Sequence, residues 1–183
     1  SHTDLSVAID FAEKAVGIAP SYYVSGNHEA WLSEDIYETF ITDLTATGVT
    51  VLADEKTDIK YNGDYITLAG VSDPDFVDAD YIFESNVGHL TEDNEHYTLL
   101  LSHRPEFFEV YSQCGVNLVL SGHTHAGQGR ILGYPLSSLM FTESEGWYEK
   151  DNQSLYINTG IGCTLPVRIG VPAEITVITL KKQ

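Results

Sequence analysis

Two segments near the start of the chain have apolar residues at helical spacing. In Asp4–Val16 the apolar positions recur every three or four residues, and Gly17 follows. In Glu34–Ala46 they again fall on one face, and Gly48 is suited to end a helix. Because this spacing gathers the apolar side chains on one stripe, each segment is predicted to form a helix that packs by one face.

Short apolar runs bounded by turn residues predict strands. Asp58–Tyr61 and Tyr65–Ala69 form a predicted hairpin, because Asn62-Gly63 supplies the positive-φ residues of a tight turn. A short helix is predicted at Pro105–Ser112. Other apolar runs predict the remaining strands. These runs are Tyr22–Ser25, Val49–Leu52, Tyr97–Leu101, Asn117–Leu120, Leu155–Asn158 and Ile175–Leu180.

Two longer segments have no clear period. Residues 70–96 are acidic and irregular, and they are predicted to form a loop with some helix. Residues 126–154 are predicted to form a long connection. Helices and strands are mixed in the first part of the chain, and strands dominate the last part. This order predicts a single α/β domain over residues 1–183, with a mixed sheet or a two-sheet sandwich flanked by helices.

The charge balance narrows the functional classes. Among 183 residues, 27 are acidic and 9 are basic, which gives a net charge of −18. Such a surface repels phosphate backbones, so no nucleic acid duplex is expected as a partner. No apolar run approaches the roughly 20 residues that span a bilayer, so no transmembrane segment is expected in this chain. The cytoplasm is the favoured compartment; membrane association or export are the alternatives if the natural protein has a further N-terminal segment.

Polar residues that can bind metals follow three of the predicted strands. They lie in Gly26-Asn27-His28-Glu29, in Ser102-His103-Arg104-Pro105 and in Gly122-His123-Thr124-His125. Ligands of open α/β sheets bind at the carboxyl ends of the strands, so these segments are expected to meet at one site.

Each segment also has a simpler interpretation. His123 and His125 would face the same side of an extended segment, but they also suit a solvated surface loop. Asn27 alone is typical of a capped turn, and His103 alone of a histidine bonded to a backbone carbonyl. The coincidence of the three segments favours metal ligation. Imidazole and amide groups suit zinc, iron, nickel, cobalt or manganese, and a pair of such ions can hold a phosphoryl group.

Other polar and aromatic residues are interpreted as structural or solvated. The acidic cluster of residues 70–96 does not have the spacing of an EF-hand loop, so it is predicted to be solvated. Its members are Asp73, Asp75, Asp78 and Asp80. The aromatic residues Trp31, Trp147 and Tyr148 are interpreted as loop anchors. Arg130 and Arg168 are candidates for a phosphate contact, although Arg168 equally suits a structural pair.

The order Gly26-Asn27-His28-Glu29, His103 and Gly122-His123-Thr124-His125 resembles the motifs of the calcineurin-like metallophosphoesterases. The run Gly122–Gln128 and the tail Asn158–Ile175 are similar to a bacterial subgroup of phosphohydrolases. The resemblance extends over nearly the whole chain from residue 22 onward. It implies a four-layer αββα sandwich with a dinuclear metal centre between two sheets. It also implies hydrolysis of a small-molecule phosphomonoester or phosphodiester.

The resemblance assigns roles to individual residues. Asn27, His103 and His123 would bind the second metal ion, and His125 would bind the first. His28 would be the substrate-facing acid, oriented by a neighbouring carboxylate. The nucleophile would be a metal-bound hydroxide, and the divalent ions would be Mn, Fe, Zn, Ni or Co.

The sequence departs from the family at its start. The family's Asp-x-His and Gly-Asp-x-x-Asp motifs, which supply most ligands of the first metal, do not occur before Gly26. The segment Asp4–Val16 matches the helix that normally follows the second motif. The chain is therefore expected to be truncated by about one βαβ unit, roughly 30 residues or more. The expected consequences are one bound ion or none, impaired activity, and an exposed sheet edge that invites homo-oligomerisation.

Two alternative functions stay open. In one, the chain is a catalytically impaired or non-catalytic scaffold or binding protein with the phosphoesterase fold. In the other, Asn27, His103 and His123 form a mononuclear zinc hydrolase site, which is less favoured because asparagine is a poor zinc ligand.

Overall fold

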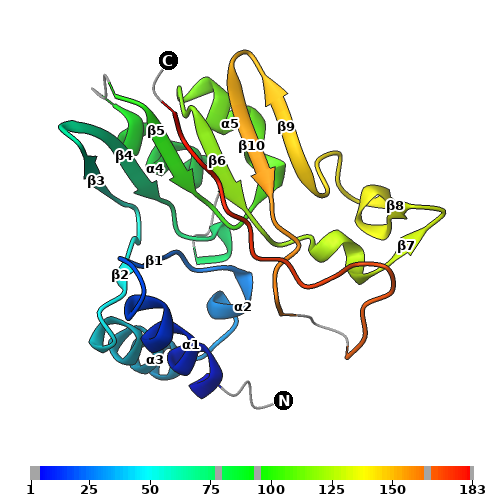
Figure 1. Cartoon of the computed structure of the whole chain (residues 1–183), viewed down its shortest axis with the longest axis horizontal. Helices are drawn as coiled ribbons and strands as arrows, with labels where there is room; N and C mark the ends of the chain where they lie inside the picture. The colour runs from blue at the N-terminus through cyan, green and yellow to red at the C-terminus, as the bar shows by residue number, and fades with distance from the viewer. Residues whose placement is uncertain (1–4, 77–79, 93–95, 163–165, 182–183) are drawn as a thin grey trace.

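A six-stranded mixed sheet is the largest element of the computed structural model, which describes residues 5–76, 80–92, 96–162 and 166–181 (Figure 1). Its strand order is β3-β4-β5-β6-β10-β9. Strands β4, β5, β6 and β10 run parallel to one another, and β3 and β9 pair antiparallel at the two edges. The strands are β3 (Glu55–Tyr61), β4 (Asp64–Gly70), β5 (Thr98–Leu101), β6 (Leu118–Ser121), β9 (Gly146–Lys150) and β10 (Gln153–Ile157).

Both faces of the sheet are covered by apolar side chains. Because neighbouring strand residues point to opposite faces, Leu99 and Leu100 of β5 enter two different cores. Leu100 lies in the core formed with α4 (Asp80–Thr91) and α5 (Phe108–Gln113), two helices on one side of the sheet. Leu99 lies in the core of the other face, together with Leu68 and Leu118. The central strands are therefore buried on both sides.

A third core joins the N-terminal helices to a short parallel strand pair. Helices α1 (Ser6–Val16) and α3 (Glu34–Ala46) pack beside β1 (Tyr22–Tyr23) and β2 (Thr50–Val51). The buried residues of this core are Ala12, Phe40, Leu44 and Val49. The two helices confirm the prediction from apolar spacing, since Ala12, Phe40 and Leu44 of the expected inward faces are buried. Ile36, which was also expected to face inward, is exposed.

Short elements follow several of these strands. They are α2 (Asn27–Ala30) after β1, η1 (Pro74–Phe76) after β4, and η2 (Pro105–Phe107) after β5. After β6 come η3 (His125–Gln128), β7 (Arg130–Ile131), β8 (Tyr134–Pro135) and η4 (Leu136–Leu139). Strands β7 and β8 pair antiparallel in a hairpin that stands beside the β9 edge of the sheet (Figure 1).

The observed elements confirm the α/β class, with a central mixed sheet and helices consistent with a metallophosphoesterase α/β sandwich. The hairpin at Asn62-Gly63 and the predicted strands before residue 160 are present, some of them shorter than expected. Helix α4 is the helical part of the segment 70–96, which was expected to be a loop with some helix, and β9 lies within the expected long connection. None of the described helices is long and apolar enough to cross a membrane.

The prediction of a strand at Ile175–Leu180 was wrong. This segment runs across a face of the sheet without strand pairing among the described residues (Figure 1). Its contacts come from side chains: Asn158 Nδ2 donates to Thr176 Oγ1 at 2.8 Å, and Ile178 packs against the core that contains Leu99. Alternating apolar residues indicate that one side of a segment is buried. A strand also requires main-chain hydrogen bonds to a neighbouring strand.

Candidate functional site

A close approach between Gly26 and His103 brings the first two segments of the site together. The chain turns at Gly26 after β1, and the Gly26 N–H donates to Glu29 Oε2 at 2.8 Å, which caps the single turn of α2. A Cβ atom at Gly26 would lie 3.0 Å from three atoms of the His103 ring. A Cβ atom at this position would push the imidazole away from the backbone, so glycine permits the close approach.

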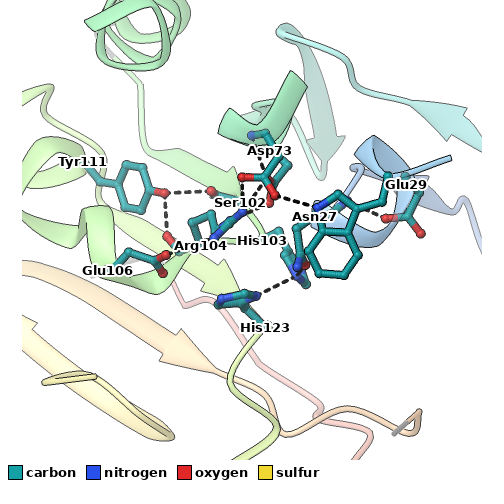
Figure 2. Close-up of polar contacts among 12 residues, drawn as sticks. Asn27, Glu29, Asp73, Ser102, His103, Arg104, Glu106, Tyr111 and His123 are labelled. Atoms are coloured by element: carbon teal, nitrogen blue, oxygen red, sulfur yellow. Dashed lines mark hydrogen bonds and ion pairs between the residues drawn. The ribbon is translucent and has the colours of Figure 1, made fainter. Parts of the chain in front are cut away.

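Asn27, His103 and His123 converge on one point, as Figure 2 shows. His103 Nε2 lies 2.9 Å from Asn27 Oδ1 and 3.2 Å from His123 Nδ1. The two imidazole rings meet edge to face, with centroids 4.9 Å apart. The three residues follow β1, β5 and β6, so the ends of three strands supply one cluster.

The three polar atoms of this cluster cannot all be satisfied by one another. If His103 Nε2 bears the proton, it can donate to Asn27 Oδ1 and must share that proton with the lone pair of His123 Nδ1. If it bears none, it accepts from His123 Nδ1–H, and two acceptors then face each other 2.9 Å apart. Lone pairs that converge in this way are typical of a site for a cation.

Burial keeps the two imidazoles neutral at neutral pH. Desolvation and the nearby His123 lower the pKa of His103 to about 4. Desolvation also lowers the pKa of His123, and the nearby Arg104 acts in the same direction. A neutral imidazole has the free lone pair that a metal ligand requires.

His125 has a separate environment close to this cluster. Its Nδ1 lies 3.2 Å from the carbonyl oxygen of Thr159, which accepts a hydrogen bond from it. Burial lowers the pKa of His125, and a charge on His125 would lower the pKa of His103 and of His123. His125 is therefore within electrostatic range of the cluster, although its hydrogen bond is made elsewhere.

The expected extended conformation of the His123–His125 segment was wrong. The φ angles of His123 and His125 are 70° and 47°, in the left-handed region, so the segment turns sharply instead of continuing β6. Within the described chain, no group of three or more His, Cys, Asp or Glu side chains is placed to hold a metal ion. The cluster of Asn27, His103 and His123 combines only two such side chains with an amide.

His28 lies on the exposed side of α2 and stacks on Trp31, with ring centroids 5.0 Å apart and planes inclined by 27°. Trp31 Nε1 donates to Asp75 Oδ2 at 3.1 Å, so this indole is fixed at both its face and its edge. The neighbouring carboxylate, that of Glu29, is bound by the Gly26 N–H. Trp31 therefore anchors α2 to residue 75, as expected of a loop anchor, and also supports the His28 ring.

Sequence reasoning missed the ion pair of Arg104 with Asp73. Arg104 Nε and Nη2 donate to the two Asp73 oxygens at 2.8 and 2.9 Å, and Nη2 also donates to Asp75 at 2.6 Å (Figure 2). The Asp73 side chain has no exposed surface. The expectation that Asp73 is solvated was therefore wrong. No local signal reveals a pair that joins loops 31 residues apart.

Of the other members of the expected acidic cluster, Asp75 also contacts Arg104. Asp75 is an exposed partner of Arg104, whereas Asp78 lies outside the described residues and the side chain of Asp80 is not described.

Tyr111 fixes the segment that contains His103 from the opposite side. Its hydroxyl donates to the Arg104 carbonyl oxygen at 2.6 Å and lies 2.7 Å from Ser102 Oγ. The Tyr111 side chain is fully buried in α5, and burial raises its pKa far above the ordinary value. Residues 102–104 are thus held by a neutral hydroxyl on one side and a carboxylate on the other.

The two rare cations near the site make structural contacts. Arg130 Nη2 pairs with Glu145 Oε2 at 2.6 Å. Arg168 donates to the carbonyl oxygens of Thr159 and Pro172 at 3.0 and 3.1 Å. The structural interpretation of Arg168 agrees with these bonds, although its partners are backbone carbonyls instead of a carboxylate.

Comparison with known proteins relates the chain to metallophosphoesterases. It is 32% identical over 167 residues to an uncharacterised metallophosphoesterase of Bacillus subtilis, YkuE; the match covers 86% of this chain and 55% of that protein. It is 30% identical over 164 residues to an uncharacterised metallophosphoesterase of Aquifex aeolicus; this match covers 87% of this chain and 60% of that protein. No protein-family model matches the chain.

A third relative is a bovine transmembrane protein with a metallophosphoesterase domain, 31% identical over 186 residues, with 88% of this chain and 38% of that protein covered. The chain thus spans little more than half the length of the first curated relatives that it matches. Similarity at about 30% identity over most of the chain, to proteins from two bacteria and an animal that are named metallophosphoesterases or for such a domain, supports the calcineurin-like metallophosphoesterase family.

Proposed function

We propose that the chain provides part of a metal-dependent phosphoester hydrolase, acting on a small-molecule phosphomonoester or phosphodiester. The observation that supports this proposal most directly is the position of His103 Nε2, which lies 2.9 Å from Asn27 Oδ1 and 3.2 Å from His123 Nδ1. The names of the relatives support the same reaction class.

The residues of this cluster fit one divalent cation. One amide oxygen and two neutral imidazole nitrogens form a ligand set that suits Mn, Fe, Zn, Ni or Co. Burial, which holds the pKa of His103 at about 4, leaves the site without a positive charge of its own at neutral pH. A bound divalent ion would supply Lewis-acid polarisation of a phosphoryl oxygen. Asn27, His103 and His123 would hold it.

His125 is the proposed ligand of the other metal ion of the pair, the first. Among the described residues, no group of three or more His, Cys, Asp or Glu side chains surrounds His125. Its Nδ1 is already hydrogen-bonded to the Thr159 carbonyl oxygen. One imidazole engaged in this way does not fit a metal ion by itself.

His28 is the proposed acid that protonates the leaving oxygen. It is exposed and stacks on Trp31. A charge on His28 would lower the pKa of His125, so His28 lies near the histidines of the site. Stacking on a fixed indole restricts the orientation of the imidazole, and a general acid needs a fixed orientation toward its substrate. The neighbouring residues 73, 75 and 104 hold the surrounding loops in place through ion pairs.

The experiment is hydrolysis of p-nitrophenyl phosphate and of bis-(p-nitrophenyl) phosphate, with and without added Mn²⁺. Wild type is expected to hydrolyse one of these esters only with the metal. His123→Ala is expected to lose that activity, and His28→Gln is expected to lower kcat more than KM. His89→Ala, which alters an exposed histidine of α4, is the control and is expected to retain activity.

A different result would support the alternative function. A chain that binds Mn²⁺ but hydrolyses neither ester would support the non-catalytic binding scaffold. Metal-independent hydrolysis that His123→Ala leaves unchanged would contradict the proposed reaction.

A further inference from the structure

Large apolar side chains are exposed on the β7–β8 hairpin and at the end of the η4 turn that follows it. We define the apolar tip as the side chains of Ile131, Leu132, Tyr134, Leu139 and Met140. All five are between 63% and 94% exposed. Residues 131–142 include no Asp, Glu, Lys or Arg, although one residue in five of the whole chain is charged. Monomeric soluble proteins rarely expose a contiguous apolar patch of this kind without a use for it.

Hydrogen bonds hold the base of the tip. Strands β7 and β8 stand away from the six-stranded sheet, as Figure 1 shows. Leu136 N donates to the Gly129 carbonyl at 2.8 Å, and Arg130 N donates to the Ile169 carbonyl at 3.0 Å. Arg130 also pairs with Glu145 at the base of the hairpin. The apolar side chains are therefore held outward by a hydrogen-bonded base.

We propose that the apolar tip inserts into the surface of a lipid membrane. This inference goes beyond the proposed reaction and concerns where the chain binds. A projecting tip of leucine, isoleucine and methionine with one tyrosine matches a lipid interface, where apolar side chains enter the acyl region and tyrosine stays at the headgroups. A protein partner would instead have to offer a groove for a hairpin with strands of only two residues.

The charge of the chain specifies the kind of lipid. A net charge of −18 repels anionic headgroups, and the uncharged segment 131–142 offers no cluster of Lys or Arg to offset that repulsion. Binding by the tip is therefore driven by burial of apolar surface and favours zwitterionic lipid.

The tip is adjacent to the candidate site. Gly127 of η3 approaches Leu136 and Ser137 so closely that a Cβ there would lie 2.5 Å from Ser137 N. At the end of the same segment, the Phe141 ring meets the His123 ring edge to face, with centroids 5.5 Å apart. The segment that carries the tip is therefore packed directly against the segment that carries His123.

The test is co-sedimentation of the chain with vesicles of phosphatidylcholine and, separately, of phosphatidylglycerol. Wild type is expected to sediment with phosphatidylcholine vesicles and less with phosphatidylglycerol vesicles. The double variant Leu132→Ser/Leu139→Ser changes no charge and is expected to bind phosphatidylcholine at least about tenfold more weakly, because two exposed leucines no longer enter the lipid. Circular dichroism checks that the double variant is folded.

A matched control separates insertion of the tip from general stickiness. Ile18→Ser alters an isoleucine that is 88% exposed at the end of α1, and it is expected to bind vesicles as wild type does. Equal loss of binding in Ile18→Ser and in the double variant would overturn the proposal. So would wild type that stays in the supernatant, or light scattering showing that the tip instead joins two copies of the chain. None of these readouts depends on hydrolysis, so a failure here is distinct from a failure of the proposed function.

Discussion

His103 Nε2 lies 2.9 Å from Asn27 Oδ1, although the two residues are 76 positions apart in the chain. The contact links the helical turn after β1 to the loop after β5, and His123 joins it from the loop after β6. Each neighbouring group that fixes these loops therefore has a measurable effect on the cluster.

Gly26→Ala should distort the cluster without unfolding the chain. The added Cβ would lie 3.0 Å from the His103 ring, which then has to move by a few tenths of an ångström away from Asn27. Because a displaced ligand binds a cation less well, we expect the affinity for Mn²⁺ to fall about tenfold. Calorimetric titration with Mn²⁺ measures this change.

Gly88→Ala is the matched control for that substitution. Nothing lies within 4 Å of a Cβ at Gly88, which is inside helix α4. Alanine favours a helix by roughly 0.5–1 kcal/mol over glycine, so stability should rise slightly while Mn²⁺ affinity stays the same. Equal Mn²⁺ affinities in the two variants would show that the contact between residue 26 and His103 is unimportant.

Asp73→Ala should lower the unfolding free energy more than the removal of a partner from an exposed ion pair does. The change leaves the guanidinium of Arg104, of which only 14% of the side chain is exposed, without its bidentate partner. Arg104 keeps its exposed partner Asp75, so the cost is that of leaving buried N–H donors of a charged group without their acceptor, about 1–3 kcal/mol. Urea unfolding measures the loss. Lys150→Ala removes the exposed partner of Glu109, and its unfolding midpoint should match that of wild type.

Glu174→Gln should change how stability depends on pH. Desolvation alone would raise the pKa of Glu174, but hydrogen bonds from Tyr156, Thr159 and Thr176 outweigh it and bring the pKa to about 2, from an ordinary 4.5. A carboxyl with a depressed pKa stabilises the fold above its unfolded-state pKa, and this stabilisation is lost as the pH falls through the folded value.

Wild type should therefore exceed Glu174→Gln in unfolding free energy near neutral pH, and the difference should shrink as the pH falls from about 5 towards 3. Urea unfolding at several pH values checks this. Because Glu174 also accepts the N–H of Thr159, whose carbonyl binds His125, the amide variant should loosen that loop. A difference that is independent of pH would contradict the assignment of the depressed pKa to Glu174.

Trp31→Ala should lower the rate of the proposed hydrolysis by removing the surface on which His28 stacks. We expect kcat to fall about tenfold with little change in KM, since the imidazole is misplaced but the cation ligands stay. Trp31→Phe keeps an aromatic face and loses only the N–H bond to Asp75, so it should retain most of the activity. Steady-state kinetics distinguish the two, and equal kcat values in both variants would exclude a role for stacking.

Local patterns were sufficient for much of the fold. Helix α3 and the β3–β4 hairpin followed from apolar spacing and from Asn62-Gly63. Helix α4 was predicted only as some helix within an irregular loop, because its acidic residues obscured the helical spacing of Phe83, Val87 and Leu90, all of which are buried. Strand β9 was missed because it is an edge strand with exposed charged residues, in a connection rich in turn residues.

The positions of the site residues were predictable only where those residues directly follow a strand. The end of a strand is visible in the sequence, so the meeting of Asn27 with His103 and His123 could be expected. The positive φ angles of His123 and His125 could not, since a turn after a strand depends on how the following segment packs. The ion pair of Arg104 with Asp73 arises from tertiary packing alone.

The most direct test of the central claim is titration of the chain with Co²⁺, followed by the visible absorption of the bound ion. We predict binding of one ion at Asn27, His103 and His123, with spectra that change when any one of these residues is replaced by alanine and persist in His89→Ala. The absence of bound-ion bands in wild type, or bands that survive His103→Ala and His123→Ala unchanged, would contradict the claim that these three side chains form a cation site.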